Sequence, residues 1–157
     1  MKYSYKALFT RSVAASGVLA AIVCTRPLPV GADGPPGRYS FPTNEVVYDT
    51  RTQLTWQREL DTTQRNQADA IRYCTALKLG DGTWRVPTRA ELLTIVDPTR
   101  FQPAIDTTAF SNTPKDAACW TSSHYVFNPD YTWSIAFESG GAGATESTMP
   151  IYVRCVR

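Results

Sequence analysis

The stretch Trp84-Arg85-Val86-Pro87-Thr88-Arg89-Ala90-Glu91-Leu92 predicts where the second of two helices begins. Thr88 and Glu91 have the spacing of a capping box. In this arrangement the Thr hydroxyl accepts a hydrogen bond from an unpaired backbone amide, and the Glu carboxylate accepts one from the Thr amide. Trp84 is expected to fill the core, and Arg85 has five N–H donors with which to hold loop carbonyls. The expected buried face consists of Leu92, Leu93, Ile95 and Val96, and Asp97-Pro98 is expected to end the helix.

The elements on either side of this helix follow from hydrophobic periodicity. A first helix is expected within residues 63–78, because Ala68, Ile71 and Cys74 recur every three residues. Trp56, Trp120 and Trp133 are expected in the core, like Trp84, and the alternative is a face of exposed Trp side chains as in sugar sites. The pattern therefore predicts an α+β domain. Its strands are expected at residues 46–48, 54–56, 119–123, 131–137 and 151–156, and a loop rich in small residues at 139–150.

The N-terminal segment has the features of an export signal. Basic residues precede an apolar run from Val13 to Val23, and small residues follow at 30–32. The apolar run is shorter than the roughly 20 residues that a membrane-spanning helix needs, and no later segment is apolar enough to span. We expect a signal peptide at 1–32, a linker at 33–45 and a domain at 46–157. The protein would be secreted, periplasmic or at the cell surface; the alternative is a lipoprotein anchored through Cys24.

Charge and cysteine content limit the partners. Residues 1–32 hold four of the 16 basic residues and none of the 14 acidic ones, which leaves 12 basic against 14 acidic residues. Nucleic acid is therefore a poor partner, because its binding needs a concentrated basic face. The cysteines that remain are Cys74, Cys119 and Cys155, an odd number that leaves one free thiol or a bond to another chain.

The candidate binding residues lie in and around one predicted loop: Tyr125, Asn128, Asp130, Tyr131 and Trp133. Asn128-Pro129-Asp130 offers oxygens for calcium, but it supplies only part of the six to eight ligands needed and also suits a simple turn. We therefore expect no cofactor and no metal, with calcium as the alternative. Ser122-Ser123-His124 invites a hydrolase interpretation, but no Gly-x-Ser-x-Gly string accompanies it.

Several strings resemble one known family, the C-terminal domain family of the Legionella collagen-like (Lcl) adhesin, found in bacterial surface and secreted proteins. They are Leu54-Thr55-Trp56-Gln57, Trp84–Leu92, Trp120-Thr121-Ser122-Ser123 and Val153-Arg154-Cys155-Val156-Arg157. The resemblance implies a fold like that of C-type lectins and formylglycine-generating enzymes, with two helices on a small twisted antiparallel sheet and long loops. It also implies a Cys74–Cys155 disulfide. The collagen-like repeat of the namesake adhesin is absent, so trimerisation through such a stalk is not implied.

The function expected from these observations is that of an exported, non-enzymatic binding module, similar to an adhesin. Loops 122–132 and 138–150 would contact a glycan or a surface partner. One alternative is an accessory or structural envelope protein that binds a protein partner, and another is an enzyme on the same fold, since one fold hosts many functions. We expect a monomer or a weak oligomer.

Overall fold

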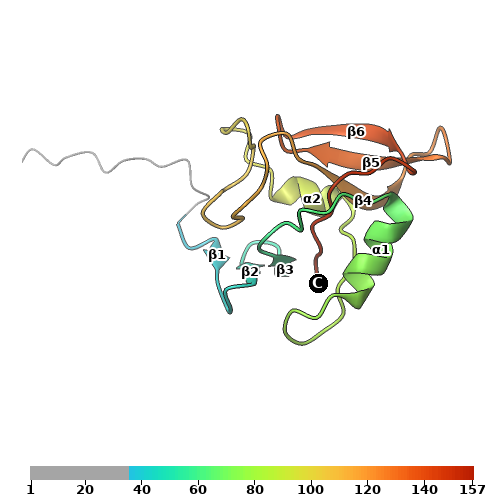
Figure 1. Ribbon diagram of the computed structural model, residues 1–157. Helices are drawn as coiled ribbons and strands as arrows, with labels where there is room; N and C mark the ends of the chain where they lie inside the picture. Colours follow the sequence, from blue (N-terminus) through green and yellow to red (C-terminus); the bar gives the residue numbers. More distant parts are fainter. Residues whose placement is uncertain (1–35) are drawn as a thin grey trace, which may run out of the picture.

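The computed structural model describes residues 36–157 and confirms the α+β class. The described residues form two three-stranded antiparallel sheets, in the orders β1-β2-β3 and β4-β5-β6, and two helices (Figure 1). The strands are β1 (Tyr39–Ser40), β2 (Val46–Asp49), β3 (Leu54–Gln57), β4 (Ala118–His124), β5 (Tyr131–Ala136) and β6 (Gly141–Glu146); the helices are α1 (Gln67–Ala76) and α2 (Arg89–Thr94). No helix among residues 36–157 has the length and apolar character that crossing a bilayer requires. The expected signal peptide and Cys24 lie outside the described residues.

The first sheet includes residues that we expected in the linker. Tyr39 and Ser40 pair with Asp49 and Tyr48 in β2. Arg38 donates to the buried Asp49 carboxylate from Nε at 3.2 Å and from Nη2 at 2.7 Å, and Nη2 also donates to the Thr94 carbonyl at 2.6 Å. Burial alone would raise the pKa of Asp49, but the bonds from Arg38 and from the Arg51 amide outweigh it and lower that pKa. The folded domain therefore begins before residue 45.

Helix α2 begins at the predicted capping box. The Glu91 amide donates to Thr88 Oγ1 at 3.2 Å, and the Thr88 amide donates to Glu91 Oε2 at 2.8 Å. The expected role of Arg85 was wrong: its guanidinium donates to both Glu91 carboxylate oxygens, at 2.8 and 2.7 Å, rather than to loop carbonyls. Figure 1 shows α2 against the sheet formed by β4, β5 and β6, which it contacts through β4 and β5.

Helix α1 is present, but its buried face was predicted correctly only at Cys74. Ala68 is exposed and Ile71 is 43% exposed, whereas Ala70 and Cys74 are fully buried. An α-helix turns about 100° per residue, so residues three and four positions apart lie on the same face. A repeat of three alone therefore does not identify which face is buried. The start of the helix is fixed by Asn66, whose side-chain oxygen accepts from the Asp69 amide at 2.8 Å.

Two other expectations near the end of the chain were also wrong. Residues 141–146 form β6, which pairs with β5 along its whole length, although 139–150 were expected to be a loop. Residues 151–156 were expected to be a strand but form isolated bridges: Ile151 with Arg65, Tyr152 with Cys119, and Val156 with both Trp56 and Arg85. Figure 1 shows this segment running between the two sheets. Its backbone groups therefore pair with several short segments instead of with one strand.

The core confirms the cysteine assignment. Cys74 and Cys155 form a disulfide with a Cα–Cα distance of 5.5 Å, and Cys119 is a buried free thiol. Burial raises the pKa of the Cys119 thiol to about 12, which keeps it protonated. Trp56, Trp84 and Trp120 are buried, as expected of core residues, whereas Trp133 is only half-buried.

Candidate binding surface

The loop between β4 and β5 holds most of the candidate residues and has a fixed backbone. The Tyr125 amide donates to the Tyr131 carbonyl at 3.0 Å, and the Tyr131 amide donates to the Asn128 carbonyl at 3.1 Å. Asn128 Oδ1 accepts from the Asp130 amide at 3.0 Å, so this side chain is used in a turn. The Asn128-Pro129-Asp130 string therefore shapes the loop.

Aromatic side chains pack along one side of this loop. The Tyr125 ring meets Trp133 edge to face, with centroids 5.1 Å apart, and meets Phe127 at 5.5 Å. Arg89, the first residue of α2, places its guanidinium carbon 4.1 Å from the Trp133 ring centroid. Such cation–π stacking holds both side chains in place. We call Arg89, Tyr125, Val126, Phe127 and Trp133 the aromatic surface.

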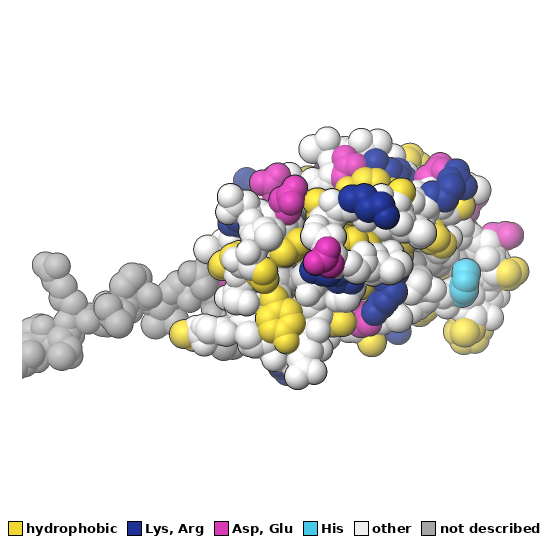
Figure 2. All heavy atoms as spheres, turned by 90° about the horizontal axis from the view of Figure 1, so that it is seen from below, with side chains coloured by type: hydrophobic (Ala, Val, Ile, Leu, Met, Phe, Trp, Pro, Cys, Tyr) yellow, Lys and Arg dark blue, Asp and Glu magenta, His cyan; other side chains and the backbone are white. Residues whose placement is uncertain are grey.

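The tip of the loop exposes two large apolar side chains in succession. Val126 and Phe127 are each 84% exposed, while Tyr125 and Trp133 behind them are half-buried. In Figure 2 hydrophobic side chains gather at the edge of the molecule beside the histidine, and His124 is the only histidine in the chain. Sequence reasoning missed Val126, Phe127 and Arg89. The available signal was a pair of large apolar residues immediately before a turn.

A groove of about 450 Å³ runs from the aromatic surface toward the start of α2. Its lining includes Arg89, Ser123, His124 and Trp133. Ser123 Oγ accepts from the Arg89 amide at 3.0 Å, so this hydroxyl fixes the junction of β4 and α2. No side-chain hydrogen bond joins His124 to Ser122 or Ser123 within residues 36–157.

Comparison with protein-family models finds one family that matches most of the chain. The family model of the Lcl C-terminal domain matches residues 45–157. The chain belongs to the Lcl C-terminal domain family. A comparison with curated proteins finds no match. The match includes the whole aromatic surface and both disulfide cysteines of this Lcl C-terminal domain.

The two loops expected to act together lie only partly together in this Lcl C-terminal domain. The Ser147 amide donates to the Asp130 carbonyl at 2.8 Å, which places residues 147–150 beside the β4–β5 loop. Glu138 lies instead at the opposite end of β5, where its carbonyl accepts from the Gln102 amide at 2.9 Å. Tyr131 is half-buried and pairs with Glu146 in β6. The 138–140 turn is therefore not part of the candidate surface.

Charge on the Lcl C-terminal domain is mixed. On the face shown in Figure 2, Lys and Arg side chains alternate with Asp and Glu side chains. Among the described residues no three His, Cys, Asp or Glu side chains gather as metal ligands would. The most distinctive feature of the surface is therefore the apolar loop tip.

Proposed function

We propose that this Lcl C-terminal domain is an exported, non-enzymatic binding module that recognises a protein partner through the aromatic surface. The observation that carries the proposal is the pair of adjacent side chains, Val126 and Phe127, each 84% exposed on a loop with a fixed backbone. Export is supported by the predicted signal peptide, and the site of action would be the cell surface, the periplasm or the medium. A C-type-lectin-like fold is part of the proposal and is supported by the family and by the antiparallel sheets with two helices.

Physical reasons favour a recess on a protein partner as the place where the loop tip binds. Burying a Val or Phe side chain releases about 1.5–3 kcal/mol, so the two tip residues could together anchor an interface. The loop hydrogen bonds and the Tyr125–Trp133 contact order the tip before binding, which lowers the entropy lost on association. Arg89 and Trp133 beside the tip are of the residue types enriched in binding hot spots.

Photo-crosslinking tests this function. A photoreactive residue at Val126, with the exported protein in envelope extract, should give one defined adduct, and Phe127→Ser should remove it. Phe101→Ser is the matched control, because Phe101 is also an exposed phenylalanine (65%) but lies outside the aromatic surface. An adduct that persists in Phe127→Ser, or disappears equally in Phe101→Ser, would rule out the loop tip as the recognition site.

A glycan is the second candidate ligand, and the groove favours it. Saccharides stack their apolar face on an aromatic ring and bond their hydroxyls to polar neighbours; here Trp133 adjoins Ser123, His124 and Arg89. A glycan array separates the candidates. Specific glycan binding that is lost in Trp133→Ala but kept in Phe127→Ser would replace the protein partner by a saccharide in the groove.

A further inference from the structure

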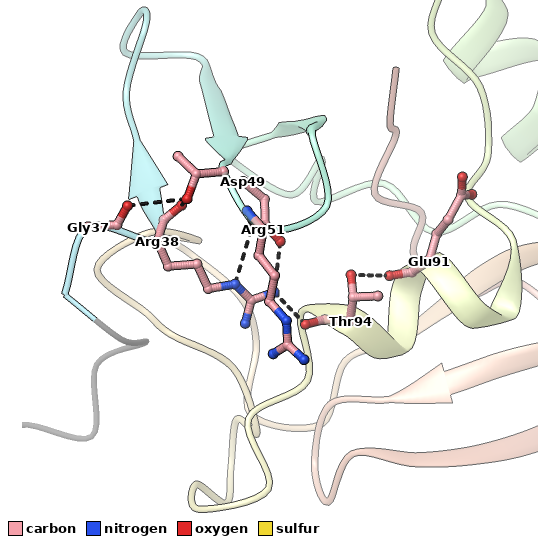
Figure 3. A network of polar contacts seen from close by, with 7 residues as sticks. Gly37, Arg38, Asp49, Arg51, Glu91 and Thr94 are labelled. Atoms are coloured by element: carbon pink, nitrogen blue, oxygen red, sulfur yellow. Dashed lines mark hydrogen bonds and ion pairs between the residues drawn. The ribbon is translucent and has the colours of Figure 1, made fainter.

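A second cavity of about 390 Å³ lies at the C-terminal end of α2, and Leu93 lines both this cavity and the groove beside Trp133. Figure 3 shows the side chains of Arg38 and Arg51 extending from the first sheet toward Thr94, the last residue of the helix. The cavity combines charged and apolar walls. They include Arg38, Arg51, Asp97 and Asp106 among the charged residues, and Leu93 and Val96 among the apolar ones.

Three of these four charged side chains are already engaged. Arg38 binds the Asp49 carboxylate and the Thr94 carbonyl, as described above. The Asp97 carboxylate accepts from the Thr99 amide at 2.9 Å and pairs with Arg100 Nε at 3.3 Å. Asp106 Oδ1 accepts from the backbone amides of residues 108 and 109, at 2.9 and 3.1 Å.

Arg51 differs from them. Its backbone amide donates to Asp49 Oδ1 at 3.0 Å, which fixes where its side chain begins. Its guanidinium has no hydrogen bond or ion pair to any residue within 36–157. The lining of the cavity therefore includes one exposed cation whose donors no other described residue takes, beside apolar side chains.

We propose that this cavity binds a ligand that combines one carboxylate with a compact apolar body. The planar guanidinium of Arg51 matches a carboxylate through two parallel hydrogen bonds. The apolar body would lie against Leu93 and Val96. The two aspartates of the cavity disfavour a ligand with further negative charge, because like charges repel at short range. Both a free organic acid and the C-terminal residue of a peptide have this chemistry.

Calorimetric titration with N-acetyl-leucine tests the proposal, with N-acetyl-leucinamide as the matched ligand, since the two differ only in the carboxylate. The acid should bind at least about tenfold more tightly than the amide, because only the acid forms the bidentate pair. Arg51→Gln should abolish this difference, and Arg51→Lys should restore part of it. Arg72→Gln is the control variant, because Arg72 is exposed and lies outside the cavity.

Each further result supports or overturns the assignment. A peptide ending in leucine that binds more tightly than N-acetyl-leucine supports a peptide source, and the reverse supports a free acid. Equal binding of acid and amide, or binding unchanged in Arg51→Gln, overturns the proposal. Inorganic phosphate binding as tightly as N-acetyl-leucine overturns the assigned ligand class. Crosslinking through Val126 should be unchanged in Arg51→Gln, so failure here is distinguishable from failure of the proposed function.

Discussion

Arg154 is a fully buried cation held by neutral groups. Its Nη1 donates to the carbonyls of Gln57 and Arg58 at 2.7 and 2.5 Å, and its Nη2 donates to Thr113 Oγ1 at 2.9 Å. Burial lowers the pKa of Arg154 to about 10, which still leaves it charged at neutral pH. The role of holding loop carbonyls, expected of Arg85, thus belongs to Arg154.

Removing this side chain should strongly destabilise the domain. Arg154→Met leaves the buried carbonyl of Gln57 and the partly buried carbonyl of Arg58 without this donor, and each unsatisfied buried group costs about 1–3 kcal/mol. We expect the free energy of unfolding in denaturant to fall by about 3 kcal/mol. Arg72→Met, at an exposed arginine, should change it by less than about 0.5 kcal/mol. Equal effects of the two substitutions would contradict the assigned role.

Glu91 gives the domain a defined acid sensitivity. The Arg85 guanidinium and the Thr88 amide and hydroxyl lower its pKa from 4.5 to about 2. A depressed pKa stabilises the folded state above the unfolded value, so this contribution is complete above pH 4.5 and is lost as pH falls toward 2. The stability difference between wild type and Glu91→Gln should therefore shrink across this window. A difference that stays constant with pH would show that the carboxylate charge contributes nothing.

Residue roles were predictable where the contacts are local. The capping box spans four positions and could be predicted directly. Arg154 could not be, because the carbonyls that it holds are 96 and 97 positions away in the chain. The exposure of Phe127 likewise depends on how β4 and β5 place their loop, which residue types alone do not specify.

At the scale of elements, the two helices were predicted and the end of the chain was not. Strand β6 contains Gly141, Ala142, Gly143 and Ala144, which have low intrinsic strand propensity. It forms because every residue of β5 supplies a partner for it. Residues 151–156 show the opposite case: they alternate like a strand but lack a single partner strand. Pairing, rather than propensity, decides both outcomes.

The disulfide ties α1 to this irregular segment and should contribute much of the stability. Cys74 and Cys155 are 81 positions apart, and cross-linking a loop of that length stabilises the folded state by roughly 4 kcal/mol. Cys74→Ser should lower the free energy of unfolding by about this amount, and Cys119→Ala should lower it by much less. Non-reducing peptide mapping checks the pairing, and a 119–155 or 74–119 peptide would refute it.

At the scale of the whole molecule, the sequence predicts an exported protein that begins at Asp33. The intact mass of secreted material should match residues 33–157, because the small residues at 30–32 are the predicted cleavage site. A diacylglycerol-modified Cys24 would contradict this prediction and make the protein a lipoprotein. After reduction the protein should be heavier by two hydrogen atoms, which is the change expected when one disulfide becomes two thiols.

Residues 151–157 contact both sheets and contribute Val153, Cys155 and Val156 to the core. These residues are synthesised after all the others in the described domain, so the core cannot close while they are still inside the ribosome. Until then the earlier strands lack partners for part of their backbone, and the growing chain stays open. An open chain is what a translocation channel accepts. In the export that we propose, the position of this late segment would set the order of events: passage through the membrane first, then closure of the core, and oxidation of Cys74 and Cys155 last.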